Sequence, residues 1–226
     1  MKKLPLKLTE EMIKIWKQCV IDYLTKLYGK PIPGLGEALM EPGVLEPMFK
    51  YKGEFLLKPG EKVMHAWYLK KGMAKLFTYD EHGEAKIFYI WNADSIIVLY
   101  KAFRERLPSQ DCYIQLMEDS ELVSITSMSM DDIYAEHTSA HELTTKILYM
   151  KTEQRDLLTG ILKMTDKLRR YCVLKQKFGW LFVNGKCRLS NEEICGFIGI
   201  TETTLREARK VCPDAEKASE KLLPDS

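Results

Sequence analysis

The residues whose types and spacing could do chemistry lie near the C-terminal end, and the chemistry they suggest is hydrogen bonding to nucleic acid. Arg206 can pair with the edge of a guanine base, and Thr203 can reach a base or a phosphate. Thr201 and the helix N-terminus that it would cap can hold a phosphate group. The candidate DNA-contacting residues are Ser190, Thr201, Glu202, Thr203, Thr204, Arg206, Glu207 and Lys210.

Two short helices must position these side chains. Ser190 and Glu193 form an S-x-x-E capping box, so a helix begins at this point. Gly199 ends that helix, because glycine readily adopts the left-handed conformation found after helix ends. Thr201 then caps a second helix through about Lys210. A helix, a short turn with glycine and a second helix predict a helix-turn-helix, although an ordinary helical corner has the same pattern.

Charge is distributed unevenly along the chain. The whole chain carries a formal charge of +2, but the segment from Lys167 to Lys210 has ten basic and four acidic residues. Its local excess of +6 leaves −4 for the remainder. A basic segment on a near-neutral chain favours a nucleic-acid partner.

A pair of histidines offers the main alternative chemistry. His137 and His141 are four residues apart, a spacing that lets one helix face bind a metal ion. Glu136 precedes the pair instead of following its first member, so the H-E-x-x-H arrangement of metalloproteases is absent. We therefore predict two solvated histidines, no metal site and no catalytic residues.

Composition favours a folded protein of the cytoplasm. Hydrophobic residues make up 46% of the chain, charged residues 29%, and no apolar run is long enough to span a bilayer. The six cysteines form no C-x-x-C pair, which favours reduced thiols. Lys7, Glu10 and Glu11 interrupt the N-terminal apolar residues, which argues against a secretory signal.

The N-terminal part alternates between helical and strand patterns. Apolar residues recur at three and four from Leu8 to Leu27, which predicts a helix, and glycines and prolines from Gly29 to Gly36 predict a loop. Short β-branched and aromatic runs separated by turn residues then predict an antiparallel sandwich or barrel. The predicted strands are Phe55–Leu57, Val63–Leu69, Ala74–Tyr79, Lys86–Trp91, Tyr113–Leu116 and Glu121–Ile125.

A long helical pattern follows, from Asp131 almost to Phe178, and Gly160 marks a candidate break. Its apolar residues alternate in steps of four and three, as in a coiled coil, so a twofold copy of the chain is one candidate partner. Packing of the same stripe on the chain's own β domain is the other, and both can hold along different turns. The predicted dimer seam contains Leu143, Ile147, Met150, Gln154, Leu157 and Ile161.

The order of these parts resembles the cyclic-AMP receptor protein/FNR (Crp/Fnr) superfamily of transcription regulators. Leu57–Glu61, Ala66–Gly72 and Tyr79–Gly83 resemble turn and strand motifs of its sensor domain. Its helix-turn-helix is resembled by Leu189–Ile194 together with Gly199–Thr201 and Thr204–Leu205. The resemblance spans roughly Val44 to Lys210. It implies an α+β fold with a cyclic-nucleotide-binding-type β-roll, a coiled-coil homodimer, promoter DNA as a partner and RNA polymerase as a further one.

The resemblance also organises the chain into parts. We predict an N-terminal helix and β-roll in residues 1–130, a dimerisation helix in 131–160 and the DNA-binding part in 161–226. No alternating β pattern follows Pro213, so the helix-turn-helix has no clear wing.

The sequence departs from the family at its ligand-binding positions. Asp94–Leu99 lacks the Gly-Glu pair that holds ribose, and Pro108–Tyr113 lacks the arginine that holds the cyclic phosphate. A buried phosphate needs a charged partner, so the sequence argues against cyclic AMP and cyclic GMP. Clustered N-terminal cysteines for an iron–sulfur centre are missing, and haem has no support. Residues for a more apolar, unidentified effector, or alternatively for core packing, are Tyr89, Trp91, Val98, Leu99, Tyr100 and Tyr113.

The second predicted helix departs from the family too. Thr203 and Glu207 replace a glutamate and an arginine, and Glu207 would face DNA with the wrong sign, although it could accept from a cytosine amine. The order of the predicted parts and the basic segment still make a regulator of transcription the main functional hypothesis. A sensor or protein-interaction module that kept the fold without binding DNA is the alternative.

Overall fold

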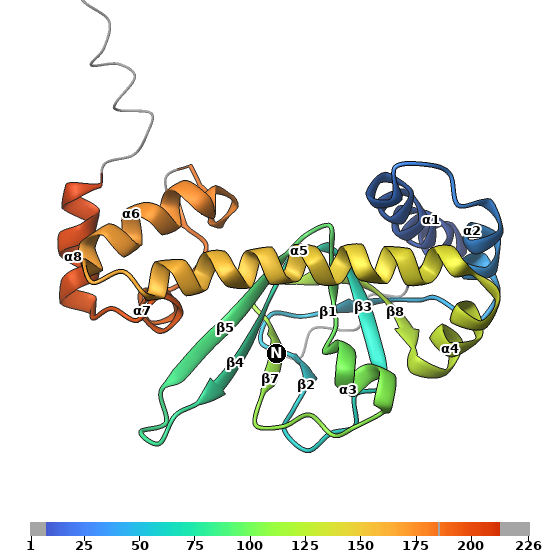
Figure 1. Ribbon diagram of the computed structural model, residues 1–226, viewed down its shortest axis with the longest axis horizontal. Coiled ribbons are helices and arrows are strands. Elements are labelled where there is room, and N and C mark those ends of the chain that lie inside the picture. Colours follow the sequence, from blue (N-terminus) through green and yellow to red (C-terminus); the bar gives the residue numbers. More distant parts are fainter. Residues whose placement is uncertain (1–7, 185, 213–226) are drawn as a thin grey trace, which may run out of the picture. The chain divides into compact units, whose positions relative to one another are not determined.

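A computed structural model of the chain describes residues 8–184 and 186–212 (Figure 1). Its helices are α1 (Glu10–Tyr28), α2 (Pro33–Met40), α3 (Tyr100–Glu105), α4 (Ser127–Glu136), α5 (Thr138–Leu162), α6 (Lys167–Lys177), α7 (Asn191–Ile198) and α8 (Glu202–Val211). Its strands are β1 (Glu46–Lys50), β2 (Phe55–Leu57), β3 (His65–Lys71), β4 (Met73–Tyr79), β5 (Ala85–Asn92), β6 (Ser95–Ile97), β7 (Tyr113–Leu116), β8 (Ser120–Thr126), β9 (Phe182–Val183) and β10 (Lys186–Cys187).

Eight of the strands form two four-stranded sheets. Their orders are β1-β8-β3-β6 and β2-β7-β4-β5, and the third sheet pairs β10 with β9. The predicted α+β fold with an antiparallel β-roll is therefore confirmed. All six predicted strands are present with ends within about two residues, as is usual for such boundaries. β1, β6 and the short hairpin β9–β10 were not predicted.

Two apolar cores lie on opposite faces of β3. Side chains alternate along a strand, so Trp67 and Leu69 join the core between the sheets, whereas Tyr68 joins a second core. The second core lies where α1, α2, α4 and the first turns of α5 cover the sheet. Residues of this strand are buried on both faces, which explains why it reads as a nearly continuous apolar run.

The N-terminal helix is confirmed, but the predicted loop from Gly29 to Gly36 is only partly correct. Thr9 caps α1 through the Met12 amide, and Gly29 ends it with a left-handed φ of 84°. The chain then forms α2 from Pro33, because proline is well suited to the first position of a helix. Leu35 and Leu39 lie on one face of α2 and are buried.

The prediction of one helix from Asp131 almost to Phe178 is wrong in its continuity. α4 begins at Ser127 and ends at Glu136, and the extended backbone of His137 (φ −125°, ψ 101°) separates it from α5. The second break follows Leu162, close to the candidate break at Gly160, and Asp166 caps α6 through the amides of Leu168 and Arg169. No helix of the described residues is both long and apolar enough to cross a membrane.

The chain divides into two compact units. The first unit comprises the chain up to Thr78 and Phe88–Thr152, and the second comprises Tyr79–Ile87 and the chain from Glu153 onward. Helix α5 passes from the first unit into the second without interruption. The division into parts 1–130, 131–160 and 161–226 stays a prediction.

Candidate functional site

The two helices of the predicted helix-turn-helix are present, with the predicted caps. The Ser190 amide donates to Glu193 Oε2 at 2.9 Å and the Glu193 amide donates to Ser190 Oγ at 3.2 Å, which completes the capping box. Gly199 has φ 62° and ψ 50°, the left-handed conformation expected of it. Thr201 accepts from the Thr204 amide at 3.2 Å and so caps α8.

Arg170 of α6 holds the turn between α7 and α8. Its guanidinium donates to the carbonyl oxygens of Ile198 at 3.1 Å and Gly199 at 3.0 Å, which end α7. It also donates twice to the Met164 carbonyl, at 2.9 and 2.8 Å. Carbonyl groups at a helix end lack intrahelical donors, so Arg170 supplies them. In the sequence, Arg170 is one residue of the basic segment, and no local pattern indicates its structural role.

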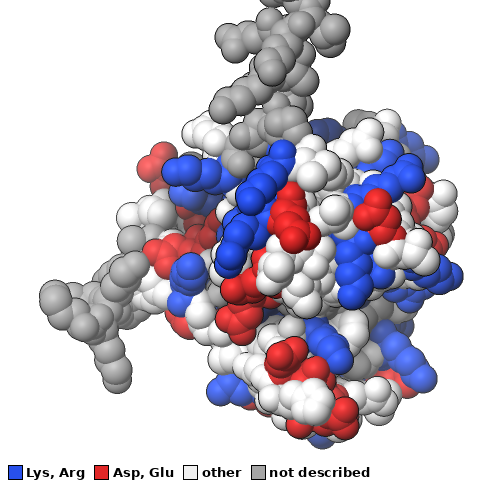
Figure 2. Space-filling view, turned by 90° about the vertical axis from the view of Figure 1, so that its left-hand side faces the viewer, with Lys and Arg blue, Asp and Glu red and all other residues white. Residues whose placement is uncertain are grey.

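One face of α8 is exposed and the other is buried. Leu205 is 1% exposed and Ala208 fully buried, and both pack with Ile194, Phe197 and Ile198 of α7. The predicted DNA-contacting residues Ser190, Thr201, Glu202, Thr203, Arg206, Glu207 and Lys210 are exposed, and Thr204 is half-buried. Figure 2 shows that Lys and Arg side chains on the displayed face are interspersed with Asp and Glu. The exposed charges of α8 also have both signs, with Glu202 and Glu207 near Arg206 and Lys210 in the sequence.

The tip of the β4–β5 hairpin packs closely against α7. A Cβ atom added to Gly196 would lie 2.5 Å from the Ala85 carbonyl oxygen, so this position has no room for a side chain. Between α6 and α7, the β9–β10 hairpin pairs Val183 with Lys186. The prediction that no wing follows α8 concerns residues 213–226, which lie outside the described residues.

Three of the predicted effector-binding residues, Tyr89, Trp91 and Val98, contact Lys151 of α5. The Lys151 ammonium donates to the Val98 carbonyl at 2.9 Å and lies 5.7 Å from the ring centroids of both Tyr89 and Trp91. These two rings are 4.8 Å apart and both are buried in the core between the sheets. A cation on aromatic faces is stabilised by the ring quadrupoles. No local pattern in the sequence indicates these contacts of Lys151.

The other predicted ligand residues have separate surroundings. Leu99 packs against the core between the sheets, and Tyr113 stacks on Phe77 with centroids 5.1 Å apart. Tyr100 lines an apolar cavity beside α5, together with Val98.

The predicted dimer seam is exposed only in part. Leu143 is 3% exposed and Ile161 is 1% exposed, so both are buried within a single chain. Ile147, Gln154 and Leu157 are half-buried. Met150 is 48% exposed, and Tyr149 beside it is 65% exposed.

The two histidines of the alternative metal pair have different neighbours. His141 stacks on Tyr134 at 4.5 Å, and its Nε2 lies 3.1 Å from the Tyr134 carbonyl oxygen. His137 Nε2 is buried without a hydrogen-bond partner. Among the described residues, no three metal-ligating side chains gather in one place.

The six cysteines are all half-buried and form no disulfide. Burial raises the pKa of the Cys172 thiol to about 11, and the Cys212 thiol beside it adds to the effect. Burial likewise raises the pKa of Cys112, Cys187 and Cys195. These four thiols are therefore protonated at neutral pH.

Comparison with known proteins finds one matching domain family and a shared fold. The family described as cyclic nucleotide-binding domain matches residues 49–137. No curated protein sequence matches the chain. The match begins near the end of β1 and covers strands β2 to β8, α3 and α4.

Solved structures extend the similarity to most of the chain. FixK2 from Bradyrhizobium japonicum is 14% identical, with a TM-score of 0.63 over 81% of this chain and 89% of its own. A protein from Eubacterium rectale assigned to the Crp/Fnr family is 13% identical, with a TM-score of 0.63 over 90% and 91%. The c-di-GMP responsive regulator CLP from Xanthomonas campestris is 11% identical, with a TM-score of 0.60 over 86% and 96%. The resemblance is thus confirmed at the level of the fold, which the chain shares with these solved structures.

Proposed function

We propose that this protein is a homodimeric, DNA-binding regulator of transcription of the Crp/Fnr type, whose effector is neither cyclic AMP nor cyclic GMP. The observation that carries the proposal is the capped α7–turn–α8 arrangement, with one face of α8 exposed and the other buried. A helix held in this way can enter the major groove, where its outward side chains reach base edges. Similar overall folds occur in other regulators of this superfamily, which supports the same role.

Selection of genomic DNA fragments by the purified chain tests this function. A regulator retains a small set of fragments whose affinity greatly exceeds that for random duplex, and binding of both falls steeply with salt as condensed counterions are released. Equal retention of all fragments, or no retention at low salt, would refute the proposal.

We expect Arg206→Ala to lower sequence preference more than overall affinity. Arg206 is exposed on α8, where two hydrogen bonds to a guanine edge are worth about 1–3 kcal/mol of discrimination. Competition between a selected fragment and single-base variants measures this preference. The matched control is Lys210→Ala on the same helix, which should weaken all fragments by a similar factor. Unchanged base preference in the Arg206 variant would remove this residue from base reading.

Dimerisation is proposed to use the exposed middle of α5. Leu143 and Ile161 are already buried in one chain, so the remaining apolar surface of the predicted seam centres on Met150, with Tyr149 next to it. An exposed apolar stripe on a helix favours burial against a partner, and a second copy places two α8 helices on one duplex.

Met150→Glu should convert the dimer to a monomer at micromolar concentration. Two added carboxylates would face one another across the twofold axis, in a contact that excludes water. Sedimentation analysis of the full chain measures the change, and Thr152→Glu, at an exposed polar position of the same helix, is the control. A monomeric unsubstituted chain, or a dimeric Met150 variant, would contradict the proposed seam.

The contacts of Lys151 support an effector other than a cyclic nucleotide. The family's arginine and Gly-Glu pair are missing from the sequence, and the Lys151 ammonium is bonded to the Val98 carbonyl and covered by two aromatic rings. A cyclic phosphate would have to displace these contacts to gain a charged partner.

A sensor or interaction module without DNA binding is the second candidate function. The mixed charges of α8 favour it, since Glu202 and Glu207 are exposed beside Arg206 and would approach phosphates. The same fragment selection separates the two functions, because only the regulator enriches specific sequences.

A further inference from the structure

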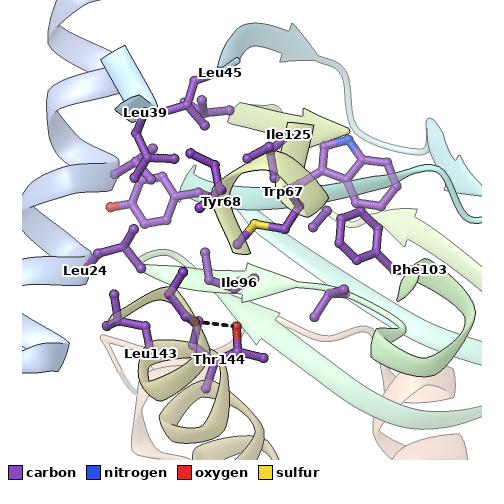
Figure 3. A pocket seen from close by; sticks show the side chains of 18 of the residues that line it. Leu24, Leu39, Leu45, Trp67, Tyr68, Ile96, Phe103, Ile125, Leu143 and Thr144 are labelled. Carbon is purple, nitrogen blue, oxygen red and sulfur yellow. Dashed lines mark hydrogen bonds between the residues drawn. The ribbon is translucent and has the colours of Figure 1, made fainter. Parts of the chain in front are cut away.

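The first unit contains an apolar cavity of about 110 Å³ on the outer face of the β1-β8-β3-β6 sheet. Figure 3 shows Leu24 and Leu39 on one side of it and Leu143 and Thr144 on another. Side chains of the five helices α1 to α5 and of strands β3, β6 and β8 form its walls. An apolar cavity of about 150 Å³ in another protein stays dry and binds benzene, so this volume suits a molecule of nearly that size.

Three hydroxyl groups give the cavity one polar edge. The Tyr134 hydroxyl lies 2.6 Å from Thr144 Oγ, and Thr144 Oγ donates to the Ala140 carbonyl at 2.9 Å. A hydroxyl has one proton to donate, so Tyr134 donates to Thr144. Tyr100 lines the same cavity and lies within hydrogen-bonding reach of Tyr134. Burial raises the pKa of Tyr134 to about 12, so its hydroxyl stays neutral.

We propose that this cavity is a binding site for a small neutral ligand with a single apolar ring and at most one hydroxyl group. The apolar walls favour the ring by removing it from water, and the hydroxyl edge offers one hydrogen bond. A carboxylate or phosphate is excluded because an unpaired charge is costly in such surroundings.

Helix α5 both lines the cavity and carries the proposed dimer contact. Leu143, Thr144, Ile147 and Leu148 form its wall on α5, and the same helix continues past Met150 to Leu162 in the second unit. A ligand that contacts α5 therefore biases the helix that the proposed dimer shares. This regulatory step rests on the proposed function, whereas ligand binding does not.

Calorimetric titration of the full chain with toluene, benzyl alcohol and benzoate tests the site. We expect toluene and benzyl alcohol to bind with one molecule per chain, and benzoate to bind at least tenfold more weakly. Ala140→Leu fills part of the cavity and should weaken both neutral ligands at least tenfold, whereas Ala135→Leu, at an exposed position of α4, should not. Absence of binding by both neutral probes, or equal binding of benzoate, would overturn the proposal.

A second variant tests the hydroxyl edge of the cavity without changing the cavity's volume as Ala140→Leu does. Tyr100→Phe should weaken benzyl alcohol by roughly fivefold, the worth of one hydrogen bond, and leave toluene unchanged. Tyr149→Phe, on the exposed face of α5, is the control. Binding that neither Ala140→Leu nor Tyr100→Phe alters would place the ligand elsewhere and refute the site. Binding without any enriched DNA fragment would refute the proposed function alone.

Discussion

Replacement of Arg170 by alanine should destabilise the second unit by about 2–4 kcal/mol and abolish specific DNA binding. The side chain donates to the carbonyl groups of Met164, Ile198 and Gly199, and so joins the segment between α5 and α6 to the turn of the helix-turn-helix. Its loss leaves three carbonyl oxygens without this donor, and the two helices of the motif lose their fixed angle. Urea denaturation and fragment binding measure the two effects.

Arg169→Ala provides a matched control for this prediction. Arg169 is the exposed neighbour on the same helix, so both variants lose one positive charge. Loss of a charge alone should lower affinity modestly and reduce the salt dependence by about one unit. If the two variants lose stability and affinity equally, Arg170 acts through its charge and the proposed clamp is wrong.

Gly72→Ala should destabilise the β-roll by about 2–6 kcal/mol. Gly72 connects β3 to β4 with a φ of 111°, a conformation that costs a side-chain-bearing residue roughly 1–3 kcal/mol. An added Cβ would also lie 2.2 Å from Ser120 Oγ and 3.1 Å from Ser120 Cα. Crowding of this kind typically costs about 1–3 kcal/mol more. Thermal and urea denaturation of the full chain measure the loss.

Gly53→Ala separates backbone strain from the contact with Ser120. Gly53 has a φ of 88°, but nothing lies within 4 Å of an added Cβ. Its replacement should therefore cost only the backbone strain, about 1–3 kcal/mol, and less than the Gly72 variant. Equal losses for the two variants would mean that Ser120 moves away without cost.

The sequence predicts the elements with strong local signals. The capping box at Ser190, the left-handed Gly199 and the Thr201 cap depend on residues close to one another in the chain, so their pattern is visible before folding. The strands bounded by turn residues were also predicted, because their signals are local in the chain. β6 (Ser95–Ile97) was not predicted, and α2 was missed because its glycines and prolines mask Leu35 and Leu39.

Tertiary contacts explain the rest of the differences. Lys151, Arg170 and Gly196 contact partners that are far away in sequence, so no local spacing indicates them. The heptad pattern of α5 likewise does not distinguish a partner chain from the chain's own core. Leu143 faces that core and Met150 faces solvent, although both fit the same repeat. An apolar period predicts that a face is buried and leaves open what covers it.

Chemical footprinting of the full chain on its best selected DNA fragment tests the central claim most directly. Two chains joined through α5 should protect two major-groove segments related by twofold symmetry, with centres one helical turn or a multiple of about 10 base pairs apart. Met150→Glu should remove the paired pattern. One protected segment with the unsubstituted chain, or protection that does not depend on sequence, would contradict a dimer that reads DNA through α8.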